Sequence, residues 1–456
     1  VYDCERSIPN LVDGFKTSLR KIMYCAFKRN LTAEVKVAQF SGYVSEHSEY
    51  HHGEASLNGA IVGLAQNFVG SNNINWLVPQ GQFGSRMMGG DDSASERYIF
   101  TYLNPLTRHV FPDKDDPILN YLNEDGTQIE PEYYVPILPT VLINGISGIG
   151  TGFSSSIPPF SPKDVVKYIR GQLRGEYEEV TFRPYYENFK GTVTPVEGDA
   201  QKFLIKGVYE KVAEDRIRIR ELPIGTWTMP YVTYLEELAD GQTDKQGKRI
   251  PPQIKDFVSN STEKVVDIQV QFAKGQLDEL ERCSGGTPGV NGLEKLMKLA
   301  TTVSITNMNL FDADCKLHKY NTVEEIIDAF IQVRYQTYHK RKEHQIREME
   351  RVMMKLSNKA KYIQANLDGK VDLRRKSHDE IHTMLMSMEY NLLDDSFDYL
   401  IKMPMVSVSK ENVEKLMREC AETAAELAAL KATSVETMWL RELDAFTEQY
   451  ELYMKK

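Results

Sequence analysis

The chain has 456 residues, of which 41% are apolar and 10% aromatic. This length exceeds one ordinary hydrophobic core, so we expect about two to four domains. No stretch approaches the roughly eighteen consecutive apolar residues of a membrane-spanning helix. The first residues also lack the basic, apolar and small-residue order of a signal peptide, so the sequence favours a soluble protein that is not secreted.

The formal net charge of −10 argues against a polyanionic partner, but the charge is unevenly distributed. Residues 6–36 carry seven cations and only two anions. Because electrostatic fields in salt solution are local, this stretch can meet phosphate groups despite the acidic total.

The five cysteines are far apart and show no CxxC spacing. An odd number of scattered cysteines is typical of reduced thiols in an intracellular protein and not of a disulfide framework or a zinc site.

The N-terminal part predicts a small helical module. Residues 10–29 place apolar side chains at helical spacing opposite lysines and arginines, and residues 51–68 predict a second helix. A strand-like piece with a glycine turn follows at 75–85. This layout is that of a helix-turn-helix or winged-helix module, which offers a helix to a DNA groove. Short helix pairs also occur in proteins that never contact DNA.

Residues 160–318 alternate between strand and helix patterns. Segments 216–222 and 265–272 have the period of two expected of strands, and 229–240 is helical. An α+β domain is predicted. The glycine-rich segment 284–292 is expected to be a flexible surface loop without chemistry.

After Tyr320 two heptad seams predict long helices that fold back as an antiparallel coiled coil. The first seam runs through Ile346, Met349, Met353, Leu356, Ala360, Ile363 and Leu367, and Asp368-Gly369 ends it. The second runs through Val413, Leu416, Cys420, Thr423, Leu427 and Leu430. An ordinary helical bundle remains the alternative. The apolar segment FDYLIKMPMVSVS between the seams needs a partner if exposed, and self-association is the simplest one.

The segment GGDDSASERYIF places Tyr98 directly after Arg97. A neighbouring cation can stabilise a phenolate and the charge on a phosphoryl group under attack, so the pair is a candidate for nucleophilic catalysis. Equally, Tyr98 is one of 24 tyrosines and can be an ordinary core aromatic.

Histidines in the segment YHHGE offer donors to a phosphate oxygen or carriers of a proton. A metal site formed by His47, His51, Glu46 and Glu54 is a weaker alternative, because no glutamate follows His47 directly as in HExxH. The glycine-rich segment 144–160 lacks the GK[ST] ending of a P-loop, so it fails as a nucleotide site and fits a close approach of two backbones.

Several long motifs together resemble the DNA breakage and rejoining core of eukaryotic-type type IIA DNA topoisomerases. The resemblance runs from Arg6 to the C-terminus and is carried by RSIPNLVDGFK, YHHGEASL, GLAQNFVGSNNINWL, GQFGSRMMGG, RYIFTYLN, DDPILNYLNEDG, PEYYVPILPTVLINGISGIGTGFSSSIPPF and KYNTVEEIIDAF. It implies an α+β multidomain fold with three parts. These are a winged-helix breakage-rejoining domain at 1–160, an α/β tower domain at 161–318, and a coiled-coil arm at 319–456 whose dimerisation tip lies at about 380–410.

The resemblance also implies roles for single residues. Tyr98 corresponds to the nucleophile that forms a 5′-phosphotyrosyl bond, Arg97 to the transition-state stabiliser, and Arg6 and His52 to accessory phosphate-binding residues. The implied DNA contacts are Lys16, Arg20, Lys21, His51, Lys316, Lys319 and Ile149, the last as a wedge between base pairs. The implied dimer gate consists of Tyr399, Leu400, Met403, Pro404 and Met405.

The implied activity is that of an ATP-dependent enzyme that breaks one duplex, passes a second and religates the first. Mg²⁺ and ATP would be its cofactors, with the binding residues for both outside this chain, so that the chain alone would cleave poorly. Double-stranded DNA and a second copy of the chain would be its partners, no membrane would be involved, and the location would be the nucleus, or a host cell or virion if a large DNA virus were the source. A non-catalytic DNA-bending dimer and a coiled-coil scaffold are the alternative functions.

The chain departs from the family pattern at the loop that begins at Asp13, where the loop geometry would differ, and at two positions near the nucleophile. DGFKTSLRK lacks the Pro-Gly turn that is usual there, Asp91 replaces a lysine, and Glu96 precedes Arg97 where a small residue or proline is usual. Asp91 and Glu96 both weaken the local positive field, so DNA affinity would be lower unless another cation compensates.

Overall fold

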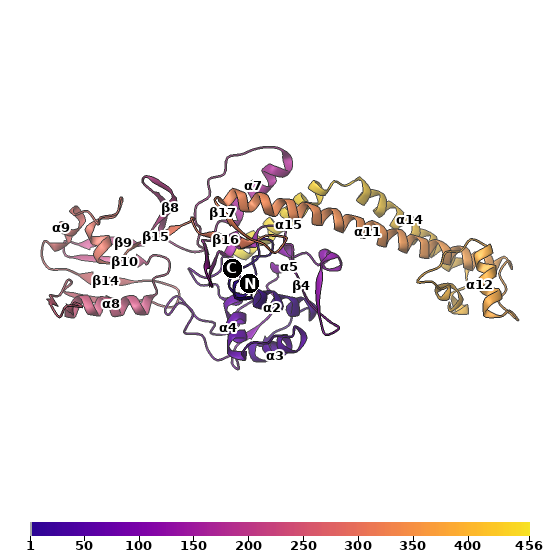
Figure 1. Cartoon of the computed structure of the whole chain (residues 1–456), viewed down its shortest axis with the longest axis horizontal. Helices are drawn as coiled ribbons and strands as arrows, with labels where there is room; N and C mark the ends of the chain where they lie inside the picture. The colour runs from indigo at the N-terminus through magenta and orange to yellow at the C-terminus, as the bar shows by residue number, and fades with distance from the viewer. Residues whose placement is uncertain (1) are drawn as a thin grey trace. The chain divides into compact units, whose positions relative to one another are not determined.

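The computed structural model describes residues 2–456 and divides into two compact units. Unit 1 comprises Val1–Arg334 and Glu442–Lys456, and unit 2 comprises Tyr335–Arg441. Helix α11 (Val323–Leu367) begins in unit 1 and ends in unit 2, whereas α15 (Val435–Met454) begins in unit 2 and ends in unit 1 (Figure 1). The predicted division into three domains, with boundaries after residues 160 and 318, remains a prediction.

The N-terminal part of unit 1 is helical around a dense apolar core. Its helices are α1 (Tyr2–Ser7), α2 (Thr17–Lys28), α3 (Val37–His47), α4 (Glu54–Ala65), α5 (Thr107–Val110), α6 (Thr140–Asn144) and α7 (Pro162–Arg174), with a 3₁₀ helix η1 (Asp113–Ile118). The helices predicted over 10–29 and 51–68 are present as α2 and α4, but α3 lies between them and was not predicted. The strand predicted at 75–85 was wrong, because only the isolated bridges Leu77–Leu103 and Gln80–Phe100 form there.

Four short antiparallel pairs cross this helical part. They are β1 (Val35–Lys36) with β2 (Phe100–Thr101), β3 (Tyr121–Glu124) with β4 (Thr127–Pro131), β5 (Ile146–Gly150) with β6 (Phe153–Ile157), and β16 (Met308–Phe311) with β17 (Leu317–Tyr320).

The predicted α+β region forms two sheets. The larger has the order β13 (Asp256–Ser259), β14 (Ile268–Gln271), β10 (Arg216–Glu221), β9 (Val208–Ala213), and the smaller has the order β15 (Ala300–Ser304), β8 (Asp199–Lys206), β7 (Thr192–Val196). A small pair, β11 (Gln242–Thr243) and β12 (Arg249–Ile250), and the helices α8 (Thr228–Asp240), α9 (Gln276–Arg282) and α10 (Gly292–Leu296) complete the region. Both predicted strands and the predicted helix are confirmed, because β10, β14 and α8 bury their alternate or periodic apolar residues in one core.

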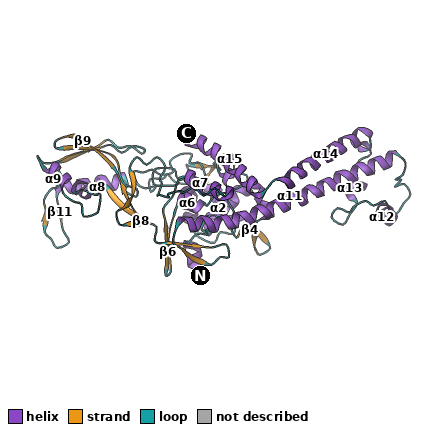
Figure 2. Cartoon of the chain, turned by 90° about the horizontal axis from the view of Figure 1, so that it is seen from above, coloured by secondary structure: helices purple, strands orange, loops and turns teal. Residues whose placement is uncertain are grey.

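Unit 2 contains the predicted long helix pair. Helix α14 (Lys410–Ala432) lies beside α11 in both views (Figures 1 and 2). Lys342 Nζ donates to the Thr433 carbonyl oxygen at 2.6 Å, while Cys420 Sγ lies 3.9 Å from the Met353 carbonyl oxygen, so the two helices run antiparallel. Beyond them α12 (His378–Ser387), α13 (Asp398–Ile401) and η2 (Met405–Ser407) form a small tip with its own core. The fold class predicted from the sequence, α+β with a long helix pair, is confirmed.

Candidate functional site

Arg97 and Tyr98 lie on an exposed loop that ends at β2. The Tyr98 side chain is 76% exposed, and Arg97 is also exposed. Neither has an ion pair or side-chain hydrogen bond within residues 2–456. Tyr98 is therefore not a core aromatic, and its hydroxyl and the neighbouring guanidinium are both free to meet a ligand.

The backbone of this loop is held at the N-terminal end of α3. Val37 N–H donates to the Ile99 carbonyl oxygen at 3.0 Å, and Ala38 N–H donates to the Glu96 carbonyl oxygen at 3.1 Å. Ile99 is buried beneath the loop. These contacts fix the backbone on both sides of Arg97 and Tyr98 while their side chains stay in solvent, which is an arrangement suited to a positioned nucleophile.

The turn before this loop is stabilised by residues that were not predicted from the sequence. The Asp92 carboxylate accepts hydrogen bonds from the Ser85 N–H at 2.8 Å and the Ser85 hydroxyl at 2.5 Å. Gly84 and Gly90 approach so closely that a Cβ on Gly84 would lie 2.6 Å from Gly90 Cα. The run GGDD in the sequence could have indicated this turn, because glycine and aspartate are common in turns that side-chain hydrogen bonds stabilise. The unusual Asp91 is exposed beside this turn.

The predicted histidines lie before α4 on the surface. His52 is exposed, with its ring centroid 5.4 Å from that of Tyr50. His51 Nε2 lies 2.8 Å from Glu124 Oε1, so the imidazole is already paired with a carboxylate on β3. His52 remains free for an anionic ligand, whereas His51 would first have to leave Glu124.

The alternative metal site does not assemble. His47 stacks on Tyr43 at a centroid distance of 3.9 Å and His51 pairs with Glu124. Over the described part of the chain, no three His, Cys, Asp or Glu side chains gather as ligands for an ion. The residues present therefore do not fit a bound Mg²⁺.

Ile149 stands at a hairpin that α1 supports. It is 83% exposed on β5, close to the turn into β6. A Cβ on Gly148 would lie 2.0 Å from the Ser7 carbonyl oxygen, so only glycine allows α1 to pack this closely on the hairpin. Arg6, which precedes Ser7, is exposed on the same helix. The structure thus brings Arg6 and Ile149 onto neighbouring elements of one surface.

A second hairpin joins this surface. Asn309 Nδ2 on β16 donates to the Ser154 carbonyl oxygen on β6 at 2.7 Å, and Asn307 Nδ2 donates to the Ser154 hydroxyl at 2.8 Å. Lys316 and Lys319, at the turn and on β17, are exposed. Cations therefore flank the hairpin that carries Ile149.

Lys16 also contacts the hairpin. Its Nζ donates to the Ser147 carbonyl oxygen at 3.1 Å, and partial burial lowers the pKa of its ammonium group. Lys16 lines a cavity of about 170 Å³ beside Phe15, Trp76 and Ile146.

Arg20 and Lys21 do not lie on the surface, so their prediction as phosphate contacts was wrong. Arg20 is 8% exposed and Lys21 is 9% exposed. Lys21 Nζ pairs with Glu130 Oε2 at 2.9 Å, and Arg20 forms a bidentate pair with Asp13 at 2.6 and 3.0 Å. Both lie in the interior, where α2 packs against α3, α4 and β4, so their charges are paired with buried carboxylates and are not available to a ligand.

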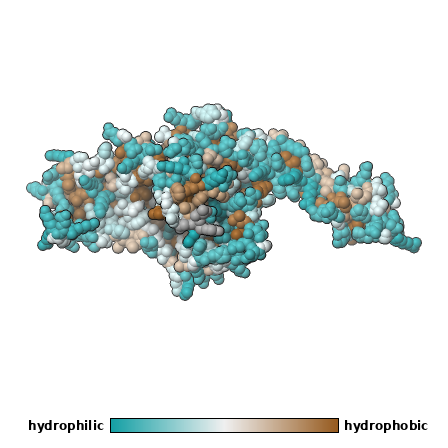
Figure 3. Space-filling view, in the orientation of Figure 1, coloured by the Kyte–Doolittle hydropathy of each residue, from teal (hydrophilic) through white to brown (hydrophobic). Residues whose placement is uncertain are grey.

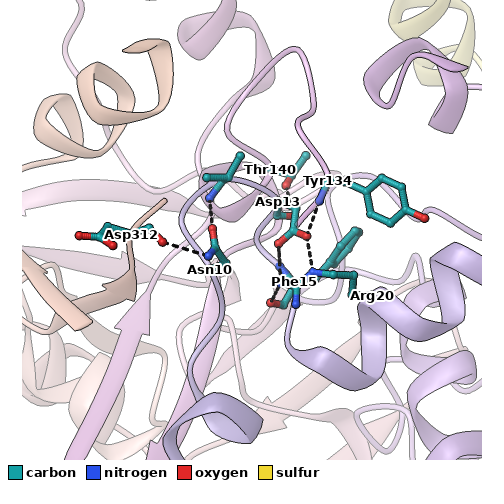
Figure 4. A network of polar contacts seen from close by, with 8 residues as sticks. Asn10, Asp13, Phe15, Arg20, Tyr134, Thr140 and Asp312 are labelled. Carbon is teal, nitrogen blue, oxygen red and sulfur yellow. Dashed lines mark hydrogen bonds and ion pairs between the residues drawn. The ribbon is translucent and has the colours of Figure 1, made fainter. Parts of the chain in front are cut away.

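Asp13 is the centre of this buried network (Figure 4). Its carboxylate also accepts the N–H groups of Phe15 and Tyr134, each at 3.0 Å, and its carbonyl oxygen accepts the Thr140 hydroxyl at 2.6 Å. Asn10 Nδ2 donates to the Asp312 carbonyl oxygen at 3.1 Å. The network ties the start of α2 to α6 and to the hairpin of Lys316.

The tip of unit 2 exposes part of the predicted dimer gate. Met405 is 85% exposed and Pro404 is exposed, while Tyr399 and Met403 are half-buried. Leu400 is fully buried in the core of the tip, so its prediction as a gate contact is corrected. Val406 is 93% exposed and was missed. Figure 3 shows apolar residues, in brown, on this part of unit 2.

No helix among residues 2–456 combines the length and apolar character that crossing a membrane requires.

A sequence profile for the A-subunit family of DNA gyrase and topoisomerase IV matches residues 6–444. The chain belongs to this family. The DNA topoisomerase 2 of Plasmodium falciparum is 39% identical over 99% of the chain, and that of Arabidopsis thaliana is 40% identical over 98%. The chain spans about a third of the length of these relatives, 33% and 32% respectively.

A solved structure has the same fold. The DNA-binding, cleavage and re-ligation domain of Plasmodium falciparum topoisomerase II matches the whole chain with a TM-score of 0.88 at 39% identity, and the chain covers 63% of it. The resemblance predicted from the sequence motifs is confirmed. The relatives also include a mitochondrial DNA topoisomerase 2 of Dictyostelium discoideum, which is 37% identical over 98% of the chain.

Proposed function

We propose that the chain is the DNA-binding, cleavage and rejoining part of a type II DNA topoisomerase. The observation that carries the proposal is the free Arg97–Tyr98 pair on a fixed loop, in a chain whose relatives are named DNA topoisomerase 2. The activity would be transient breakage of one duplex, passage of a second duplex and religation, driven by ATP in the complete protein.

In the proposed reaction, Tyr98 Oη attacks a backbone phosphorus. The Tyr98 Oη–P bond forms while the P–O3′ bond breaks, so the phosphate and the 5′ end of the broken strand stay attached to Tyr98. The phenol releases its proton to solvent, and the leaving 3′ oxygen takes up a proton from solvent and becomes a hydroxyl. Arg97 stabilises the charge that develops on the phosphoryl oxygens. Arg6 and His52 act as accessory phosphate ligands. Religation is the reverse, with the 3′ hydroxyl displacing Tyr98 Oη.

Duplex binding is proposed on the surface formed by α1 and the two hairpins. Ile149 would enter between base pairs and kink the duplex, as apolar wedges do in DNA-bending proteins. Lys16, Lys316 and Lys319 would contact phosphates, and His51 would do so after leaving Glu124. Because no base-reading side chain is assigned, binding would be largely independent of sequence.

Mg²⁺ and ATP would act in the complete protein, and we propose that both bind to residues other than those described here, because the relatives are about three times longer than this chain. A divalent ion would supply stabilisation of the leaving 3′ oxygen. We further propose a homodimer joined through the N-terminal helical part and the tip, and a nuclear location.

The decisive test is Tyr98→Phe, made in the complete protein with Mg²⁺. Phenylalanine keeps the ring and removes the oxygen, and the ring is exposed, so folding and DNA affinity should be unchanged while covalent protein–DNA adducts disappear. The matched control is Tyr177→Phe, another tyrosine of similar exposure at 82%. Adducts that persist in Tyr98→Phe and map to another tyrosine would refute the assignment and favour a non-catalytic DNA-bending dimer.

A further inference from the structure

The turn formed by residues 84–92 caps the start of helix α8 in the α+β region. The first N–H groups of a helix have no partner within the helix itself. Thr228 N–H donates to the Arg86 carbonyl oxygen at 3.1 Å. Met229 N–H donates to the Met87 carbonyl oxygen at 2.9 Å, and the next residue of the helix is a proline, which has no N–H group. The backbone of the 84–92 turn therefore satisfies the free donors at this end of α8.

A buried ion pair joins the turn to strand β10 of the same region. Arg86 is 5% exposed, and its Nη2 pairs with Oε1 of Glu221, which is 1% exposed. Glu221 is itself held by backbone groups. Its Oε2 accepts the Lys190 N–H at 3.2 Å, and its Oε1 also accepts the Leu222 N–H at 3.0 Å. The pair therefore fixes the Arg86 side chain against a carboxylate that has a defined position.

Trp227, the residue before α8, packs on the 84–92 turn. Gly89 has a φ of +65°, and a Cβ at this position would overlap Trp227 Nε1, so only glycine allows the indole to lie this close. The same indole would lie 3.2 Å from a Cβ on Gly70, and its ring centroid is 5.7 Å from that of Phe68. The turn and α8 thus meet through backbone hydrogen bonds, an ion pair and ring packing.

The turn is connected to the loop of Tyr98 through Ser85 and Asp92. Ser85 directly precedes Arg86, and its N–H and hydroxyl groups both donate to the Asp92 carboxylate. Residues 93–97 then lead from Asp92 to Tyr98. The guanidinium of Arg86 is buried and paired, so it is not available to a phosphate. Any influence of Arg86 on Tyr98 must pass through these residues.

We propose that Arg86 is a positioning residue for Tyr98 in the cleavage reaction, and that it fixes the nucleophile relative to the α+β region. This inference rests on the proposed function of Tyr98 and adds a residue that does not touch the reacting phosphate. Consecutive residues 85–87 contact the loop of Tyr98 on one side and β10 and α8 on the other. An ion pair that only stabilised the fold would not require this double connection. Because a displacement of about 1 Å can slow a reaction by roughly a hundredfold, such a connection matters to the rate.

The test separates position from stability. Arg86→Met/Glu221→Gln removes both charges, so no unpaired charge is buried and the fold should be retained. In the complete protein with Mg²⁺, single-turnover formation of the Tyr98 adduct should slow by roughly tenfold to a hundredfold, while duplex affinity stays the same. Arg86→Lys keeps a cation opposite Glu221 and should recover most of the rate.

The matched control lies on the same strand. Arg218 on β10 forms a bidentate pair with Asp267, with both contacts at 2.8 Å. Among residues 2–456, neither side chain has a hydrogen bond or ion pair with the 84–92 turn. Arg218→Met/Asp267→Asn therefore neutralises a pair of the same kind without touching the turn, and it should leave the adduct rate unchanged.

Hydrogen exchange provides a readout that does not depend on cleavage. Without DNA, amide hydrogens of residues 93–98 should exchange severalfold faster in Arg86→Met/Glu221→Gln than in the parent protein, because this loop loses one of its two anchors while its contacts with α3 remain. The β10 control should exchange at the parent rate in this segment. Unfolding in urea is measured alongside, so that a change in the loop is not mistaken for a loss of global stability.

Three results would overturn the inference. Arg86→Met/Glu221→Gln could form adducts at the parent rate, the β10 control could slow them equally, or the adduct rate could fall without faster exchange at 93–98. Failure of the proposed function is distinguished by the parent protein. If the parent formed no adduct at Tyr98, the proposed function would be refuted and the positioning role would fall with it, whereas the three results above are obtained with adducts present in the parent.

Discussion

Replacing Arg20 by methionine should destabilise unit 1 severely. Methionine keeps much of the packing but leaves the Asp13 carboxylate, which is fully buried, without its cation. Asp13 would retain only the N–H groups of Phe15 and Tyr134. Breaking a buried ion pair on one side costs about 3–5 kcal/mol, which is a large part of the roughly 5–15 kcal/mol that stabilises a typical domain.

The assay is urea denaturation followed by the fluorescence of Trp76, with Trp227 and Trp439 replaced by phenylalanine. Trp76 is 2% exposed, and its ring centroid lies 5.3 Å from that of Phe111, which in turn stacks on Phe15 beside the network. The signal therefore reports the surroundings of Asp13.

Two further variants serve as controls for Arg20→Met. Asp13→Asn/Arg20→Met removes both charges and should recover much of the lost stability, because a buried pair contributes little compared with its neutral replacement. Lys16→Ala, which loses one hydrogen bond to the Ser147 carbonyl oxygen, should cost only about 1 kcal/mol. If Arg20→Met unfolded at the same urea concentration as the native chain but bound DNA more weakly, Arg20 would be a phosphate ligand and the reasoning from burial would be wrong.

Three other predictions concern the proposed site and the tip. Arg97→Lys keeps the charge but loses the planar fork of the guanidinium, so in the complete protein it should slow cleavage by roughly a hundredfold to a thousandfold. DNA affinity should change far less, and an equal loss of cleavage and of affinity would contradict a transition-state role. Ile149→Ala should leave affinity nearly intact and reduce the bend, measured by fluorescence transfer between the ends of a duplex, and an unchanged bend would remove the wedge. Met405→Ser/Val406→Ser should weaken dimerisation in sedimentation equilibrium, whereas Met417→Ser, at 57% exposure on α14, should not; a dimer unaffected by the tip variant would exclude this surface.

The features that the sequence predicted best were those whose apolar pattern repeats many times. The seams of α11 and α14 and the alternation in β10 and β14 repeat often enough for one face to be identified. Short elements were predicted less well, because α3 spans only 11 residues and buries Val37, Phe40 and Val44, which is too few repeats to identify one face with certainty from the sequence. Residues 75–85 pair only through isolated bridges.

Among the predicted site residues, those identified from a sequence motif agree with the structure better than those identified from charge on a helix. The motif placed Tyr98 and Ile149 in the sequence, and both are exposed. Arg20 and Lys21 were misjudged, because the direction in which a cation on an amphipathic helix points depends on acidic partners far away in the chain. Lys21 pairs with Glu130, and no local spacing reveals that contact.

The division of unit 1 into two stretches of chain has a consequence for the order of folding. Residues 442–456 follow the whole of unit 2, yet Tyr453 donates to Asn75 Oδ1 at 2.6 Å and Asp444 accepts from Arg170 at 2.7 Å. During synthesis, Asn75 and Arg170 are therefore made well before their partners Tyr453 and Asp444. Joining the final helix to the first part closes a long loop, and the entropic cost of that closure is lower once unit 2 has already folded. Folding of unit 2 would thus precede the last step in the folding of unit 1, and variants that slow the folding of unit 2 should delay the completion of unit 1.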